Sequence, residues 1–192
     1  MTLEISEETP ADLAEYARIP IAFEVSRVLE VAPRGDPPGG FALSERRLDT
    51  PYMKDYDAIQ GEGPTGWAHR FDMSNWGVLA ARLAGRRVGG VVLAFDTPGL
   101  DMLEGRTDLA VLWDLRVSPG ARRQGVGTTL FQAAEAWAKA RRCRLLKIET
   151  QNINVPACRF YARHGCALGT ACSFAYPELP DEIQLIWHKE LA

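Results

Sequence analysis

The chain has 192 residues, which is enough for one globular domain with a sizeable core. Its charged residues (24%), hydrophobic residues (46%) and net charge of −3 argue against a nucleic-acid-binding protein. No apolar run approaches the length of a membrane span, and the acidic start, MTLEISEETP, lacks the basic and apolar blocks of a signal peptide. We therefore expect a cytoplasmic protein that binds neither membranes nor nucleic acid.

The cysteine pattern argues against disulfides and metal binding. The four cysteines are Cys143, Cys158, Cys166 and Cys172, and none belongs to a C-x-x-C pair. No histidine lies at zinc-finger spacing from them. We expect free thiols in a reducing compartment and no metal site.

The first 75 residues carry the weakest structural pattern. Residues 10–18 predict a short helix with proline at its start, and part of 19–31 predicts a strand because it is rich in β-branched residues. The stretch RGDPPGG at 34–40 has the composition of a loop. Residues 41–75 mix aromatic, acidic, glycine and proline residues and predict no particular element.

The pattern is clearer from residue 76 onward. Apolar runs at 76–83 and 88–95, joined by AGRR, predict a β-hairpin, and 110–117 predicts another strand. Residues 125–141 predict a helix because apolar side chains recur at three- and four-residue spacing: Val126, Leu130, Ala133, Ala134 and Trp137.

The last fifty residues continue the alternation of strands and helices. Strands are predicted at 145–150, 166–175 and 183–188. A helix is predicted at 155–164, with Asn154 as its cap and Gly165 as its terminator. A strand–helix–strand unit needs a parallel strand pair, whereas hairpins pair antiparallel, so the elements predict one α/β domain with a mixed sheet.

The loop VSPGARRQGVGT at 117–128 is the first candidate functional motif. Glycines let backbone amides approach a bulky anion, a helix N-terminus adds a positive dipole end, and Arg122 and Arg123 add charge. The loop is neither a Walker loop nor the dinucleotide fingerprint, since the required Gly-Lys-Ser/Thr and first glycine are missing. A pyrophosphate cradle and an ordinary glycine-rich turn with solvated arginines both remain open.

A second motif, ETQNINVPACRFYARHGCALG at 149–169, places Tyr161 seven residues after Asn154 on a helix that follows a strand. Together with Arg122-x-x-Gly125-x-Gly127 after a strand ending in V-x-P, it resembles the GNAT N-acetyltransferases over about residues 76–190. The residue sequence of the second motif is similar to that of streptothricin acetyltransferases, which are antibiotic-resistance members of that superfamily. By this resemblance, residues 1–75 lie on the substrate side and residues 76–190 form the acetyl-CoA-binding core of a single domain, 1–192.

The resemblance implies a GNAT-like mixed, mostly antiparallel sheet with a central parallel strand pair, flanked by helices. It implies acetyl-CoA as cosubstrate, without a metal, and it implies that Tyr161 acts as general acid. The residues that it assigns to the cosubstrate are Leu115 and Val117 for the pantetheine arm, Arg122, Arg123, Gln124, Gly125, Val126, Gly127 and Thr128 for the pyrophosphate, and Asn154 for the pantetheine or its thioester end.

Acetyl transfer also needs a group that accepts the ammonium proton. Asp114 and Glu149 are candidates because strand carboxylates in a buried sheet need a reason to be there. For each, a salt bridge to Arg116 or Arg144 is the alternative. Tyr161 has an alternative as well, because a tyrosine on a helix face is often a core residue.

Acidic and aromatic residues between 49 and 76 could attract a cationic amine, although solvated loop residues would have the same composition: Asp49, Asp55, Asp57, Glu62 and Asp72 with Tyr52, Tyr56, Trp67 and Trp76. We therefore expect an enzyme that acetylates a small, cationic primary amine by direct attack, such as streptothricin. The alternatives are an acetyltransferase for protein amines or polyamines and a non-catalytic coenzyme A sensor. The sequence also leaves a homodimer open.

Overall fold

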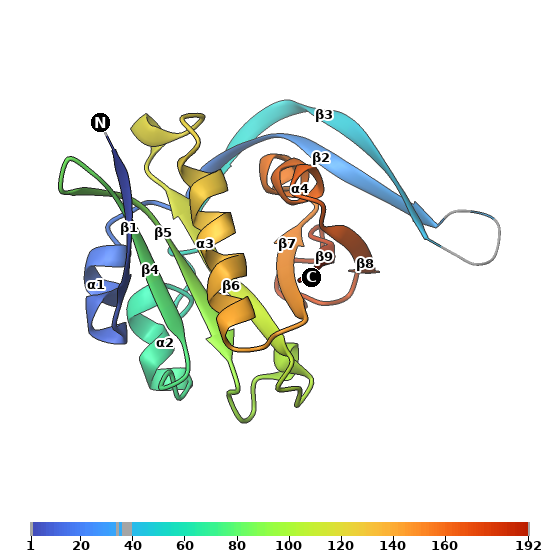
Figure 1. Ribbon diagram of the computed structural model, residues 1–192. Helices are drawn as coiled ribbons and strands as arrows, with labels where there is room; N and C mark the ends of the chain where they lie inside the picture. Colours follow the sequence, from blue (N-terminus) through green and yellow to red (C-terminus); the bar gives the residue numbers. More distant parts are fainter. Residues whose placement is uncertain (1, 34, 36–39, 192) are drawn as a thin grey trace. The chain divides into compact units, whose positions relative to one another are not determined.

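The computed structural model describes residues 2–33, 35 and 40–191 (Figure 1). The chain divides into two compact units that are both discontinuous in sequence. The first unit contains Met1–Ala22, Asp55–Leu146 and Leu191–Ala192, and the second contains Phe23–Lys54 and Lys147–Glu190. Of the loop expected at 34–40, only Gly35 and Gly40 are described, and the rest lies outside the described residues.

The first unit is built on four consecutive antiparallel strands. They are β1 (Leu3–Glu8), β4 (Gly77–Leu83), β5 (Arg86–Phe95) and β6 (Leu109–Val117). Its helices are α1 (Leu13–Tyr16), α2 (Pro64–Arg70) and α3 (Val126–Ala140), with short 3₁₀ turns at Pro10–Asp12, Asp101–Leu103 and Pro119–Ala121. The expected helix at 10–18, the hairpin and the helix at 125–141 are confirmed within a few residues.

Two adjacent glycines on β5 show how helices cover both faces of these strands. A Cβ on Gly89 would lie 3.0 Å from Leu130 of α3, whereas a Cβ on Gly90 would lie 2.6 Å from the ring of Tyr16 on α1. Successive residues of a strand point to opposite faces, so α3 and α1 pack on opposite sides (Figure 1). Neither position has room for a side chain.

Aromatic side chains dominate the core on the α1 and α2 side. Tyr16, Trp67 and Trp76 are buried there with apolar residues of β4, β5 and β6, and Trp113 packs against them. Trp137 of α3 is also buried, and its ring fills the space beside Gly77. The apolar spacing that predicted α3 therefore marks the face that it buries.

The second unit contains two pieces of sheet. β2 (Phe23–Pro33) pairs antiparallel with β3 (Phe41–Lys54), and β8 (Ala167–Cys172) pairs antiparallel with β9 (Gln184–Glu190). Strand β7 (Leu145–Gln151) starts in the first unit and continues into the second, and helix α4 (Val155–Arg163) contacts β2. The strands expected near 19–31, 145–150, 166–175 and 183–188 are confirmed, whereas β1, β3 and α2 were not expected.

The larger sheet has the strand order β1-β4-β5-β6-β7-β9-β8, with a parallel β6–β7 pair in a mostly antiparallel arrangement. This confirms the fold class expected from the sequence. None of the helices in the described residues has both the length and the apolarity to span a membrane.

Candidate active site

Strand β6 carries an irregularity at the position where the sequence placed a catalytic candidate. Asp114 pairs with Val92 and Leu112 pairs with Leu93, which leaves Trp113 as an extra residue, a β-bulge. The Trp113 ring lies 5.2 Å from Phe71 and 5.3 Å from Trp76, measured between ring centroids. Bulges bend a strand and are common beside active sites, where they re-aim side chains.

Asp114 lies in a buried network centred on Arg116. The Arg116 guanidinium donates to both oxygens of Asp114, at 3.0 and 2.6 Å, and to both oxygens of Asp57, at 2.7 and 3.2 Å. It also donates to the Ile19 carbonyl at 3.0 Å, and the Tyr16 hydroxyl donates to Asp114 at 2.6 Å. The network joins α1, the segment before α2 and strand β6.

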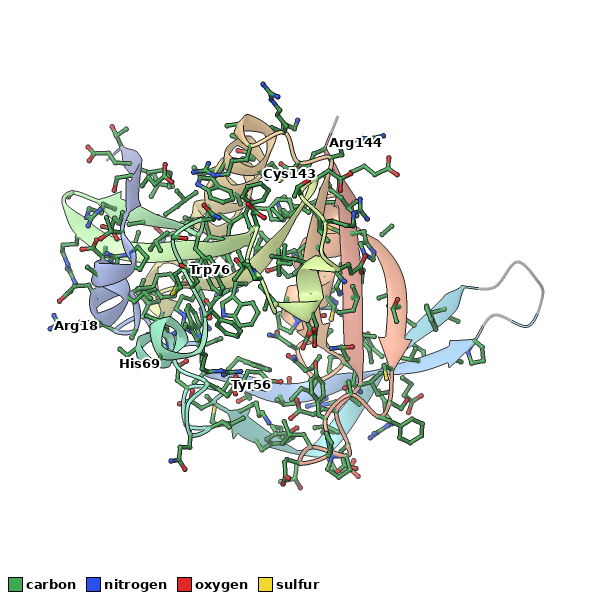
Figure 2. All side chains as sticks on the ribbon, turned by 90° about the horizontal axis from the view of Figure 1, so that it is seen from below. Arg18, Tyr56, His69, Trp76, Cys143 and Arg144 are labelled. Atoms are coloured by element: carbon green, nitrogen blue, oxygen red, sulfur yellow. The ribbon has the colours of Figure 1, made fainter. Side chains whose placement is uncertain are left out.

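The electrostatics of this network favour a structural role for Asp114. Burial opposes the positive charge of Arg116, but its hydrogen bonds and its proximity to Asp114 and Asp57 outweigh this, so its pKa is raised. Burial and the charge of Asp114 raise the pKa of Tyr16, so its hydroxyl stays a donor. Both oxygens of Asp114 thus already accept hydrogen bonds, and the salt bridge to Arg116 is the alternative that forms. The other partner considered, Arg144, is exposed (Figure 2).

The loop after β6 has an open anion-binding geometry. Gly125 is the N-cap of α3 with φ +84, and a Cβ there would meet no atom within 4 Å. The cap receives no side-chain hydrogen bond, and α3 runs for 15 residues behind it. Amides at the start of such a helix attract phosphate groups.

Side chains of the same loop are arranged to hold its shape. Arg122 donates from Nε to the Val117 carbonyl at 3.0 Å, and Gln124 donates to the Gly120 carbonyl at 2.8 Å. Both arginines are exposed, and Arg123 adopts φ 61. These residues fit a pyrophosphate, because fixed cations and helix amides lie together without a carboxylate among residues 118–128.

The two β6 residues assigned to the pantetheine arm, Leu115 and Val117, are half-buried and pair with Val91 and Gly89 of β5. The Ser118 amide donates to the Val88 carbonyl at 2.8 Å, which continues this pairing to the end of the strand. With the loop at 118–128, the first unit therefore contains all the cosubstrate residues predicted from the sequence except Asn154.

Asn154 caps helix α4 in the second unit, as its position in the sequence predicted. Its side-chain oxygen accepts the Ala157 amide at 3.2 Å, so its amino group is the part left to reach a ligand. Gly165 ends the helix region with φ +76. Tyr161, two turns after Asn154, is buried, and its ring lies 5.2 Å from that of Phe160.

Glu149 on β7 has surroundings unlike those of Asp114. Its Oε1 accepts the Tyr176 hydroxyl at 2.5 Å and the Gln151 amide group at 3.4 Å, and its Oε2 accepts the Gln184 amide group at 2.8 Å. Neither Arg116 nor Arg144 pairs with it, so the salt bridge considered as an alternative does not form. Sequence reasoning missed Tyr176, which lies between two strands without a motif.

Asn152 was also missed, although it lies inside the second motif. Its side-chain oxygen accepts the Ile183 amide at 2.8 Å, and its amino group donates to the Leu29 carbonyl at 3.1 Å. Its backbone exchanges hydrogen bonds with the same two residues. Asn152 therefore ties β2 and the start of β9 to the end of β7.

The cysteines are poor nucleophile candidates. All four are free. Burial raises the pKa of Cys158 to about 11, and its sulfur lies 3.3 Å from the Thr150 hydroxyl. Burial likewise raises the pKa of Cys143. Among the described residues, no group of three or more His, Cys, Asp or Glu could hold a metal ion.

The acidic residues expected to attract a cationic amine mostly have local partners. Four of the five are engaged in the first unit: Asp55 with the Asp57 amide, Asp57 with Arg116, Glu62 with Arg70 and Asp72 with the Ser74 amide. Asp49 is exposed on β3. The ion pairs of Asp57 and Glu62 lower the free negative charge near residues 49–76, whereas the backbone hydrogen bonds of Asp55 and Asp72 do not neutralise those carboxylates.

Residues 43–166 match the acetyltransferase (GNAT) family. Streptothricin acetyltransferase A of Bacillus subtilis is 27% identical over 78% of this chain and 80% of its own length. The Streptomyces lavendulae streptothricin acetyltransferase is 28% identical over 88% of this chain and 86% of its own length, so the likeness extends beyond the C-terminal half.

Two solved structures have a similar fold. The crystal structure of nourseothricin acetyltransferase matches with a TM-score of 0.76 at 23% identity, over 100% of both chains. A Bacillus anthracis protein in complex with acetyl coenzyme A matches with a TM-score of 0.77 at 24% identity, over 98% of this chain and 99% of that one.

Proposed function

Because the chain belongs to the acetyltransferase (GNAT) family, we propose that it transfers an acetyl group from acetyl-CoA to a primary amine of a small cationic molecule. The observation that carries this proposal is the loop at 118–128, where the start of α3 without a side-chain cap, Gly125 with open space beside it and two exposed arginines lie together. Acetyl-CoA is the acetyl donor of this family. A streptothricin-type antibiotic is the proposed acceptor, because relatives of that name match most of the chain.

Each proposed site residue then has one task. Arg122 and Arg123 bind the pyrophosphate with the amides of residues 125–128, and the main chain of Leu115 and Val117 pairs with the pantetheine arm. The amino group of Asn154 contacts the thioester end. Acetyl-CoA supplies an acetyl group that is activated as a thioester.

Two further residues move the protons. Glu149 takes a proton from the acceptor's ammonium group, so that the neutral amine attacks the acetyl group directly. Tyr161 donates a proton to the departing sulfur, which leaves as a thiol, and the second proton that the nitrogen loses on forming the amide returns to Tyr161, while Glu149 releases its proton to solvent. Asp114 is the alternative proton acceptor, and its buried ion pair with Arg116 counts against it. No cysteine needs to be acylated.

The test of cosubstrate binding is Gly125→Asp, with Gly99→Asp as the matched control. Both glycines have positive φ, near +80, and a Cβ would meet no atom within 4 Å at either one. Only Gly125 lies in the proposed pyrophosphate loop, so its aspartate should abolish acetyl-CoA binding in calorimetry while the control binds normally. Equal affinity in the two folded variants would refute the proposed loop.

The acceptor is tested by thiol release from acetyl-CoA with a panel of amines: streptothricin, a linear polyamine and a peptide with a free N-terminus. We expect streptothricin to have the highest kcat/KM, and added salt to lower this value because it screens charge attraction. Preference for the peptide or the polyamine would replace the antibiotic as acceptor. Binding of acetyl-CoA without release on any amine would identify a coenzyme A sensor instead.

A further inference from the structure

We infer that Tyr176 is a positioning residue, which fixes the Glu149 carboxylate so that it receives the ammonium group of the acceptor. This inference rests on the proposed function. Tyr176 lies between β8 and β9, and its hydroxyl donates to Glu149 Oε1 at 2.5 Å. Gln151 also donates to Oε1, at 3.4 Å, and Gln184 donates to Oε2 at 2.8 Å, so neutral donors hold both oxygens.

The charge on Glu149 has no counter-ion among the described residues, since its partners are Tyr176, Gln151 and Gln184. Two buried carboxylates among the described residues, by contrast, pair with cations: Asp114 with Arg116 and Glu182 with Lys54. A partly buried carboxylate whose hydrogen-bond partners are all neutral has no cation beside it and binds one favourably. An ammonium ion would be such a partner.

Tyr176 suits this role because it stays protonated. Burial raises its pKa, and the charge of Glu149 and the hydrogen bond to it raise the pKa further. Tyr176 therefore donates to Glu149 throughout the working pH range and does not compete with it for the substrate's proton. The charge of Glu182 also raises the pKa of Tyr176. Lys147 lies on the same face of β7 as Glu149, because alternate residues of a strand point to the same side.

The segment that carries Tyr176 is also anchored independently of Glu149. Glu182 pairs with Lys54, and the Ile183 amide donates to the Asn152 side chain at 2.8 Å. Within the segment, the Leu179 amide donates to the Tyr176 carbonyl at 3.0 Å. Removing the Tyr176 hydroxyl should therefore release the carboxylate of Glu149 without unfolding the segment.

The test is a double-mutant cycle with Tyr176→Phe and Glu149→Gln, and Ser173→Ala as control, since it removes an exposed hydroxyl from the same segment. At saturating acetyl-CoA, Tyr176→Phe should lower kcat/KM for an ammonium acceptor about tenfold, as expected for a lost hydrogen bond to a charged group. An alkoxyamine, which is neutral at pH 7, should lose little. The double variant should be no worse than Glu149→Gln alone, because Tyr176 acts through Glu149.

Two further measurements keep the outcomes separate. Affinity for acetyl-CoA and the melting temperature should be the same in all variants. The positioning role would be overturned, while the proposed function stood, if Tyr176→Phe had the same kcat/KM as Ser173→Ala. It would also be overturned if the double variant lost kcat/KM by the product of the two single losses. A wild-type chain that binds acetyl-CoA but acetylates no amine would overturn both.

Discussion

Replacing Arg116 with methionine is expected to destabilise the first unit severely. The Arg116 side chain is 1% exposed and donates five hydrogen bonds, to Asp114, Asp57 and the Ile19 carbonyl. Methionine removes them all and leaves the Asp114 carboxylate, which is 5% exposed, with only the Tyr16 hydroxyl. Removing one partner of a buried ion pair costs about 3–5 kcal/mol. At about 2–4 °C per kcal/mol for a chain of this size, the melting temperature should fall by about 6–20 °C.

Thermal and urea unfolding, followed by circular dichroism, measure this loss. The control is Arg70→Met, because Arg70 forms an exposed ion pair with Glu62, and exposed pairs contribute about 0–1 kcal/mol. Adding Asp114→Leu to Arg116→Met should recover part of the stability, since no charge is then left buried beside Tyr16. A melting temperature for Arg116→Met within about 2 °C of that for Arg70→Met would refute the reasoning.

Three other predictions concern proton transfer and thiols. Tyr161→Phe should lower kcat about a hundred- to ten-thousand-fold at saturating acetyl-CoA, as for loss of a general acid, with little change in acetyl-CoA affinity; full activity would leave Tyr161 a packing residue. Cys158→Ser should keep turnover within a few-fold, and iodoacetamide should modify Cys158 slowly at pH 8, because its pKa is about 11; rapid loss of activity on alkylation at this residue would contradict this. Tyr16 and Tyr176 hold their protons more tightly in the folded chain than at the ordinary pKa of 10.0, so stability should fall as the pH rises above 10. Ultraviolet titration should show both tyrosines ionising only with unfolding, and early ionisation of either would oppose the assigned contacts.

Local sequence patterns predicted the helices and strands whose buried side chains recur at a regular spacing or whose ends carry a capping residue. Helix α3 followed its apolar spacing, and α4 followed its Asn154 cap and Gly165 terminator. Strand β3 gave no such signal, because it pairs only with β2 and exposes most side chains on both faces. Strand β1 pairs only with β4 at the edge of the larger sheet, and its acidic residues mask the alternation.

The geometry of the candidate site was predictable where it depends on residues close together in the sequence. The glycine loop and the Asn154 cap are local, so their spacing alone indicated their geometry. The hydrogen bonds from Arg116 to Asp57 and from Tyr176 to Glu149 join residues 59 and 27 positions apart. Such pairs depend on the fold, and composition could not distinguish an acidic residue with a local partner from one that is open to a ligand.

The two candidate proton acceptors show why this distinction decides the chemistry. A base must hold an oxygen that can exchange its present partner for the substrate's proton. At Asp114, that exchange would break the ion pair with Arg116. The Arg116 guanidinium also donates to Asp57 and to the Ile19 carbonyl after α1, so the exchange would disturb the fold. At Glu149, the partners are two amide groups and one hydroxyl, and none of them is a cation. A guanidinium contacts the Asp114 carboxylate, which therefore stabilises the fold, whereas the neutral donors around the Glu149 carboxylate support the proposal that Glu149 accepts the proton.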